Sequence, residues 1–184
     1  MKTRLLAVLV ITLIFTTMSY AFDFKSEQPM LISSAGQSAD ILMVKILAKK
    51  ANLKFTVDKA ATPDKLKDQA TLVLVSGGST KGLGAAKTDK QQEINRIKSL
   101  IDEAKKQKKN VIIMHVGGKA RRGKLSDEFN KLTAERADCL VVVKGGDKDQ
   151  FFSNIAKEKK IPIKLIDKIM EAGDVLKNIF SKVE

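Results

Sequence analysis

The chain has 184 residues, a formal net charge of +13 and one cysteine, which is enough length for a domain with its own core and excludes an internal disulfide. Aromatic residues make up only 5% of the chain and tryptophan is absent, so stacking on bases or sugar rings is poorly provided for. The composition therefore disfavours nucleic acid as a partner. It favours small anions, anionic membranes or cell-wall polymers, unless the lysines serve only as a solvated surface.

Residues 1–21 have the pattern of a secretory signal peptide. Lys2 and Arg4 precede an apolar run over residues 5–15, and a small–x–small cleavage site ends at Ala21. The run is shorter than the roughly 20 residues that span a bilayer, which disfavours an uncleaved anchor. We expect an exported protein, periplasmic or extracellular after cleavage near Ala21. Loss of two positive charges would leave the mature chain at +11.

After a lead-in at residues 22–29, predicted strands and helices alternate. Short apolar or alternating runs predict strands at residues 30–33, 54–58, 71–76, 111–116, 139–144 and 161–166. Apolar residues spaced three and four apart predict helices at residues 40–51, 63–69, 89–108, 126–137, 149–159 and 168–180. Ser38 or Asp40 is expected to cap the first helix and Ser126 the fourth, and a loop is expected after the third strand, to about Lys87.

This alternation predicts one α/β domain over residues 30–184, with three αβα layers around a mostly parallel, doubly wound sheet of about six strands. The strand at residues 71–76 is apolar throughout and should be central. The strand at residues 54–58 alternates, and Pro162 lies in the last strand, as is typical of sheet edges. The pattern favours a flavodoxin-like order, 2-1-3-4-5-6. A Rossmann order would move the apolar third strand to an edge and is the alternative.

Polar, glycine-rich turns follow four of the strands, at the sheet edge where doubly wound folds bind ligands. Free backbone amides, hydroxyls and lysines together suit a carboxylate or a phosphate. The alternative is that the glycines only make tight turns. The predicted ligand-binding residues are Ser34, Gly36, Gln37, Ser38, Ser76, Gly77, Gly78, Ser79, Lys81, Gly117, Gly118, Lys119 and Gly145, with Arg121, Arg122 and Lys144 adding positive potential.

Known catalytic and nucleotide motifs fit poorly. The glycines from Gly82 begin a dinucleotide fingerprint, but Lys87 stands where a small residue is needed. The P-loop spacing at residues 118–125 lacks the hydroxyl after its lysine, and Asp40 replaces the last glycine of a nucleophile elbow. We predict no cofactor and assign no catalytic residue. One histidine and one cysteine make a metal site such as zinc very unfavourable.

Two single residues have alternative interpretations. His115, at the end of a predicted strand, is either a general base or a hydrogen-bonded strand residue. Cys139 begins an apolar strand and is expected to be a small buried hydrophobe rather than a nucleophile.

The segment LISSAGQSADILMVKILAKKANL, residues 31–53, resembles a family of exported bacterial proteins known as domain of unknown function 6305. The matching features are the Ser-Ala-Gly-Gln-Ser turn and the lysine-containing helix behind it, and LVLVSGGSTKGLGAA is similar in kind. The resemblance extends over residues 30–183. It implies an exported single domain, without an established activity, ligand or catalytic residue.

The leading hypothesis is an extracytoplasmic protein that binds a small anionic ligand at its strand ends. One alternative is a hydrolase or transferase that uses the same cleft, with Ser34, Ser38 or His115 reactive. The other is a basic module that docks on membrane or cell-wall polyanions. The sequence does not indicate an oligomeric state.

Overall fold

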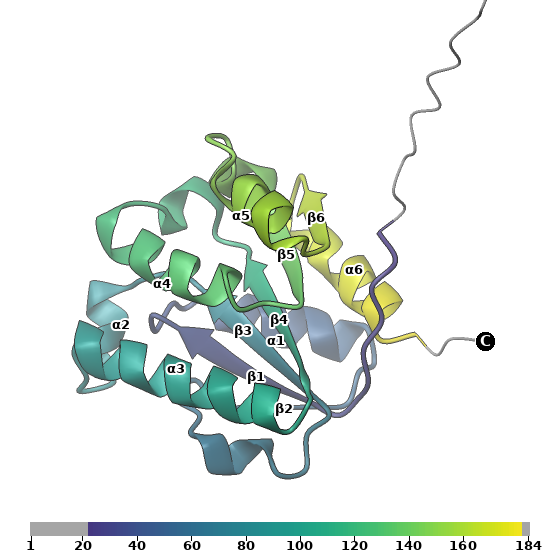
Figure 1. Ribbon diagram of the computed structural model, residues 1–184, viewed down its shortest axis with the longest axis horizontal. Coiled ribbons are helices and arrows are strands. Elements are labelled where there is room, and N and C mark those ends of the chain that lie inside the picture. Colours follow the sequence, from purple (N-terminus) through teal and green to yellow (C-terminus); the bar gives the residue numbers. More distant parts are fainter. Residues whose placement is uncertain (1–21, 182–184) are drawn as a thin grey trace, which may run out of the picture.

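The computed structural model describes residues 22–181 (Figure 1). The predicted signal peptide lies outside these residues and stays a prediction. Six parallel strands form one sheet in the order β2-β1-β3-β4-β5-β6, which confirms the flavodoxin-like order and rules out the Rossmann alternative. The strands are β1 Met30–Ala35, β2 Phe55–Val57, β3 Thr71–Ser76, β4 Asn110–His115, β5 Cys139–Val143 and β6 Ile163–Ile166.

Helices connect the strands and cover both faces of the sheet. The α-helices are α1 Ile41–Lys50, α2 Thr80–Ala85, α3 Lys90–Lys106, α4 Lys124–Ala134, α5 Phe151–Lys159 and α6 Ala172–Ile179. Short 3-10 helices are η1 Pro63–Leu66, η2 Gly118–Arg121, η3 Lys144–Gly146 and η4 Ile169–Glu171. In Figure 1, α3, α4 and α5 lie on one face, and α1 and α6 lie on the other.

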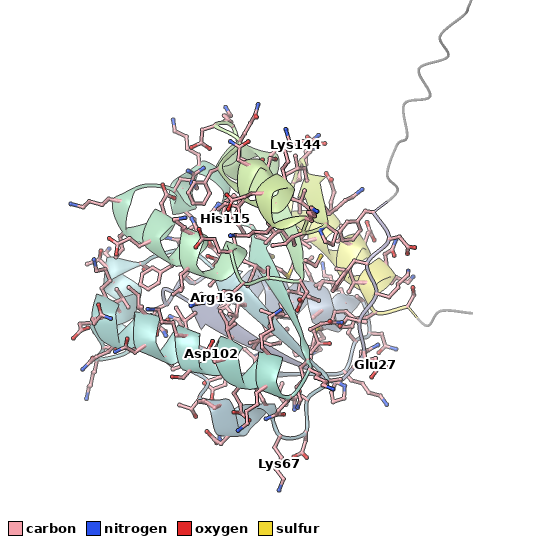
Figure 2. The ribbon with its side chains drawn as sticks, in the orientation of Figure 1. Glu27, Lys67, Asp102, His115, Arg136 and Lys144 are labelled. Carbon is pink, nitrogen blue, oxygen red and sulfur yellow. The ribbon has the colours of Figure 1, made fainter. Side chains whose placement is uncertain are left out.

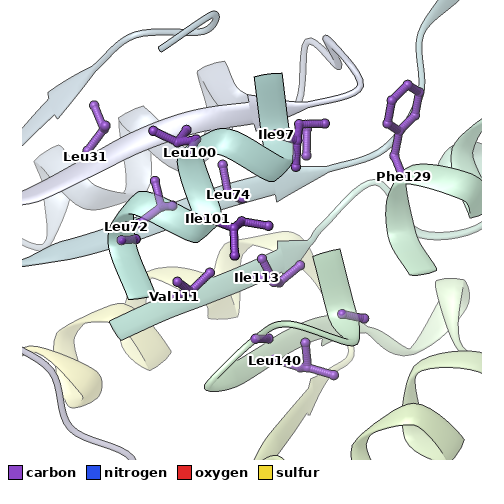
Figure 3. Close-up of a cluster of buried hydrophobic side chains, with 14 of the residues drawn as sticks. Leu31, Leu72, Leu74, Ile97, Leu100, Ile101, Val111, Ile113, Phe129 and Leu140 are labelled. Atoms are coloured by element: carbon purple, nitrogen blue, oxygen red, sulfur yellow. The ribbon is translucent and has the colours of Figure 1, made fainter. Parts of the chain in front are cut away.

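Each face buries its own apolar cluster. Side chains alternate along a strand, so Leu72 and Leu74 of β3 face α3, whereas Val73 and Val75 face α1 and α6. Figure 3 shows the first cluster, in which Ile97 of α3 and, one turn later, Leu100 and Ile101 lie over the sheet. Burial on both faces explains why β3 is apolar throughout and occupies the centre of the sheet.

The two edge strands are the two that the sequence indicated. Phe55 and Val57 of β2 are half-buried while Thr56 between them is exposed, and Lys164 of β6 is exposed. Pro162 precedes β6 rather than lying within it, and its carbonyl accepts a 2.9 Å hydrogen bond from the Leu140 amide. Cys139 is fully buried at the start of β5, and this burial raises the pKa of its thiol.

Two local predictions, a loop after β3 and a cap at Ser126, were wrong, and the predicted cap of α1 holds in position only. The predicted loop after β3 contains helix α2, because the Ser79 hydroxyl accepts a hydrogen bond from the Gly82 amide and caps a short helix. Asp40 occupies the N-cap position of α1 without a side-chain capping bond, and the Ser38 hydroxyl accepts only from the Asp40 amide. Ser126 lies inside α4, which begins two residues earlier, and its hydroxyl bonds Gly78 instead.

Within residues 22–181, no helix has both the length and the apolar character needed to cross a membrane.

Candidate functional site

The carboxyl ends of β1 and β3 lie side by side at the point where the winding of the sheet reverses. The Gly77 amide donates to the Ala35 carbonyl at 3.0 Å, and the Ser79 amide donates to the Gly36 carbonyl at 2.9 Å. Gln37 also pairs with Gly78 in an isolated antiparallel bridge. The structure therefore brings together the turns after β1 and β3, two of the four turns that were predicted to lie at this edge.

Two glycines in this region are required by close packing. Gly36 has a φ of +97°, and a methyl group added to it would lie 2.8 Å from both the Gly77 carbonyl oxygen and the Phe129 ring. A methyl group at Gly82 would overlap the Gln37 carbonyl oxygen. Gly82 thus allows α2 to pack directly on the turn after β1.

The turn after β1 already holds a carboxylate, which comes from Glu93 of α3. The Gly36 amide donates to Glu93 Oε1 at 3.0 Å, and Gln37 Nε2 lies 3.1 Å from each carboxylate oxygen. Glu93 is only 1% exposed. A backbone amide and a side-chain amide therefore bind an internal anion at the place where the sequence predicted an external one.

Arg96 completes this buried cluster. Its Nε donates to Glu93 Oε2 at 2.8 Å, and its Nη2 donates to Glu93 Oε1 at 2.7 Å. The same guanidinium donates to the carbonyls of Ser34 and Ala61, at 2.5 and 2.8 Å. Because both charges are paired and hydrogen-bonded, the cluster ties α3 to β1 and to the segment after β2.

Sequence reasoning missed Glu93, although a signal was present. The helix predicted at residues 89–108 has apolar residues spaced three and four apart, among them Ile97, Leu100, Ile101 and Ala104. Glu93 lies four residues before Ile97 and therefore falls on the same face. A carboxylate on a buried helical stripe requires a buried partner, and the donor-rich turn after β1 provides it.

The hydroxyls of the predicted site are mostly engaged inside the protein. Ser76 Oγ donates to Asn130 Oδ1 at 2.6 Å and lies 3.2 Å from Thr133 Oγ1, and the Gly78 amide donates to Ser126 Oγ at 3.1 Å. The side chains of Ser34, Gln37, Ser38 and Ser76 are all buried. Among the described residues, Ser34 Oγ and Gln37 Oε1 have no hydrogen-bond partner.

The turns after β4 and β5 form the other half of this edge. A methyl group at Gly145 would lie 3.9 Å from the Lys119 amide nitrogen, and one at Gly118 (φ +55°) would lie 3.6 Å from Val143. A methyl group at Gly117 would overlap Arg121, so this glycine lets the arginine cross the turn. The predicted glycines of β4 and β5 therefore share one surface with Lys119.

Most of the predicted cations around these turns are in ion pairs. Arg121 Nε lies 2.9 Å from Asp40 Oδ2, and Lys144 Nζ lies 2.8 Å from Asp167 Oδ1. Arg122 has three kinds of partner: Asp127 at 2.7 Å, Asp149 at 2.8 Å, and the Phe151 ring, whose centre is 4.4 Å from the guanidinium carbon. These three cations add less positive potential than the sequence suggested.

Lys81 and Lys119 differ from these cations. Both side chains are exposed, and neither forms an ion pair within the part of the chain that the structure describes. Lys81 lies in the first turn of α2 and Lys119 lies in η2. The segment before α2 adjoins η2, because a methyl group at Gly77 would lie 3.1 Å from Arg121. Positive charge therefore stays available at the exposed rim of the edge.

His115 lies below this rim and is fully buried. Its Nε2 lies 3.2 Å from the Gly118 carbonyl, which can only accept, so Nε2 carries the proton. Burial lowers the pKa of His115, opposed by that carbonyl, and the Phe152 ring lies 4.7 Å away. Within residues 22–181, His115 forms no hydrogen bond with a serine side chain.

Two surface pockets lie away from this edge. One, of about 350 Å³, lies between the last turns of α3 and α4 and includes Asp102 and Arg136; the other, of about 480 Å³, includes Lys67 and Glu103. Figure 2 shows Lys67 and Lys144 at opposite ends of the molecule, with His115 nearer Lys144. The described residues contain no group of three or more histidine, cysteine or acidic side chains that could hold a metal ion.

The fold and this edge define an α/β domain of flavodoxin-like strand order with glycine-rich turns at its carboxyl edge. A family model described as "Domain of unknown function (DUF6305)" matches residues 27–180. The chain belongs to this family, which confirms the resemblance seen in its sequence. None of the curated proteins matches the chain.

Several solved structures are similar to this chain. A GDSL-like lipase from Bacteroides thetaiotaomicron is 15% identical, with 74% of this chain and 66% of the lipase covered and a TM-score of 0.36. A putative lipolytic protein of the G-D-S-L family from Desulfitobacterium hafniense is 11% identical, with 75% and 77% covered and a TM-score of 0.36. The chain thus spans slightly less than two thirds of the lipase. At these values the likeness carries no argument about activity.

Proposed function

We propose that this chain binds a small anion, a carboxylate or a phosphate, at the exposed rim of the carboxyl edge. The rim consists of Ser79, Lys81, Gly117, Lys119 and Gly145. The observation that supports the proposal is the contrast among its cations: Arg121, Arg122 and Lys144 are paired with carboxylates, whereas Lys81 and Lys119 are exposed and without such a partner in the described chain. Ammonium groups on α2 and η2, whose leading segments adjoin, suit an anion that is shared between them.

In this proposal, the buried residues of the predicted site support the rim and do not contact the ligand. Ser34, Gln37, Ser38 and Ser76 are buried, and Glu93 already occupies the donors of the turn after β1. A ligand at the rim can keep part of its hydration and does not have to displace Glu93. These buried residues fix the positions of α2 and η2, which carry the two lysines.

Thermal unfolding of the protein that begins at Phe22 tests the proposal. Phosphate, acetate and citrate are titrated against sodium chloride at equal ionic strength, because exposed charges respond to screening alone. We expect at least one of these anions to raise the melting temperature with concentration, as a ligand that binds only the folded state does. The K81Q/K119Q variant should lose this increase.

The matched control is K67Q/K98Q, which removes one exposed lysine directly after η1 and one from α3 and changes the net charge equally. The control should respond as the wild type does. An equal response to chloride, or an equal loss of response in the control, would show that the effect is general electrostatics. No response to any of the three anions at millimolar concentrations would overturn the proposal.

A further inference from the structure

Helix α1 exposes apolar side chains at the centre of its outward face. Leu42 is 60% exposed and Ile46 is 47% exposed, and they lie four residues apart on one side of the helix. The buried side is formed by Ile41, Val44, Leu47 and Ala48. In the described chain, the only other large hydrophobic side chain with comparable exposure is Met170, at 51%.

Lysines flank this apolar pair. At 100° per residue, Lys45 and Lys49 lie on one side of Leu42 and Ile46, and Lys50 lies on the other. Helix α1 contains no acidic residue, and within residues 22–181 none of its three lysines forms an ion pair. The outward face therefore combines a small apolar centre with uncompensated positive charge.

Met170 lies in η4, which precedes α6, the helix that packs beside α1. A methyl group at Gly173, near the start of α6, would lie 3.5 Å from Leu47 Cδ2 of α1, so the two helices are in contact there.

We propose that this face of α1, consisting of Leu42, Lys45, Ile46, Lys49 and Lys50, docks on an anionic lipid surface. A helix with an apolar strip and flanking lysines inserts its apolar side chains at the boundary of headgroups and acyl chains, while the ammonium groups stay among the anionic headgroups. This face differs from the outward face of α3, where lysines alternate with Asp102 and Glu103.

The same face is poorly suited to a stable protein interface. Such interfaces bury on the order of 1,200–2,000 Å² around a well-packed apolar core. Leu42 and Ile46 instead lie on a convex helix surface and are surrounded by long, flexible lysine side chains. A headgroup layer adapts to a convex surface and does not require a complementary groove.

Co-sedimentation of the protein that begins at Phe22 with lipid vesicles tests the proposal. Vesicles of phosphatidylglycerol and phosphatidylcholine are compared with pure phosphatidylcholine at low and high salt. We expect the wild type to bind only the anionic vesicles, with at least a tenfold weaker affinity for the L42Q/I46Q variant. The K45Q/K49Q/K50Q variant should lose binding. The K67Q/K98Q/K157Q variant, which removes the same charge from exposed positions outside α1, should retain it.

A fluorescence measurement locates the contact. The chain has no tryptophan, so L42W introduces a single reporter on the proposed face, and K98W places the same reporter on α3. The emission of L42W should shift to shorter wavelength on anionic vesicles, whereas that of K98W should not. All substituted side chains are exposed, so circular dichroism is expected to show unchanged folding.

Four results would overturn the proposal. They are the absence of binding to anionic vesicles at low salt, undiminished binding of L42Q/I46Q, an equal loss of binding in both lysine variants, and equal shifts of the two tryptophan reporters. A dimer in size-exclusion chromatography that depends on Leu42 and Ile46, without vesicle binding, would assign this face to a protein contact instead.

Discussion

The two halves of the carboxyl edge use similar residues in different ways. In the β1/β3 half, Glu93 and Arg96 are buried together and bonded to the backbone of the turn. In the β4/β5 half, Arg122 and Lys144 pair with acids that are largely exposed to solvent. A buried ion pair is costly to break, whereas an exposed pair contributes little. Burial, and not residue type, therefore separates a structural charge cluster from a surface at which a ligand can compete.

The E93Q substitution tests the buried half and should have the largest effect. It leaves the Arg96 charge without its carboxylate in a site that is almost closed to water. Breaking a buried pair costs about 3–5 kcal/mol of unfolding free energy, measured by urea denaturation. The matched variant E103Q, on the same helix but more exposed, should change stability by less than about 0.5 kcal/mol.

The E93A substitution examines the same cluster by rescue. Removal of the side chain leaves a cavity lined by the Gly36 amide, Gln37 and Arg96, all of which are donors. Acetate or formate should raise the melting temperature of E93A more than that of the wild type, with chloride as the control for ionic strength. An equal response of both proteins would contradict the view that this turn selects a carboxylate.

The G82A substitution tests the packing of α2 on the buried half. The added methyl group would overlap the Gln37 carbonyl oxygen, and neither backbone can move away freely. We expect a loss of about 1–3 kcal/mol in unfolding free energy. The control is G84A in the same helix, where the methyl group would have no neighbour within 4 Å. G84A should increase stability by up to about 1 kcal/mol, so destabilisation by both variants would contradict this explanation.

The fold was predictable because its signals are local. Apolar strands alternating with amphipathic helices indicated the parallel sheet, and the alternating pattern of Phe55 and Val57 indicated an edge. The turns of the site were also predictable, because the strand order brings Gly36 and Gly77 together. These inferences needed only periodicity and the chirality of β-α-β connections.

The partners of the polar side chains were not predictable in the same way. Glu93 and Gln37 are 56 residues apart in sequence. The sequence does not distinguish this pair from other pairs of a carboxylate and an amide. Arg122 was expected to add positive potential at the site, yet it pairs with Asp127 and Asp149, because α4 and α5 both begin beside it. Such pairings depend on tertiary geometry. A charged residue on a predicted buried stripe, as at position 93, is the one local sign of them.

The pH dependence of stability tests the burial of His115 below the β4/β5 half. Its pKa is lowered in the folded protein by burial, so the unfolded chain takes up a proton below about pH 6.5 while the folded protein does not. Stability should therefore fall as the pH decreases from 7 to 5, by up to about 1.4 kcal/mol per pH unit. His115 is the only histidine in the chain, so H115Q should make this decline in stability less steep. Parallel curves for both proteins would contradict the assignment.

The pair of Arg122 and Asp149 tests the exposed half and should have the smallest effect. Hydrogen bonding to Arg122 lowers the pKa of Asp149 to about 2, below the value of about 3.9 in an unfolded chain. The pair therefore stabilises the fold above about pH 4, and this contribution is lost as the pH falls toward 2. Because Asp149 is exposed, D149N should cost at most about 1 kcal/mol at pH 6, and less at high salt. The control D102N removes an exposed carboxylate from α3. If the cost of D149N exceeded that of E93Q, or persisted unchanged at pH 2, the distinction between a buried and an exposed half would fail, because the exposed pair would then behave as a desolvated one.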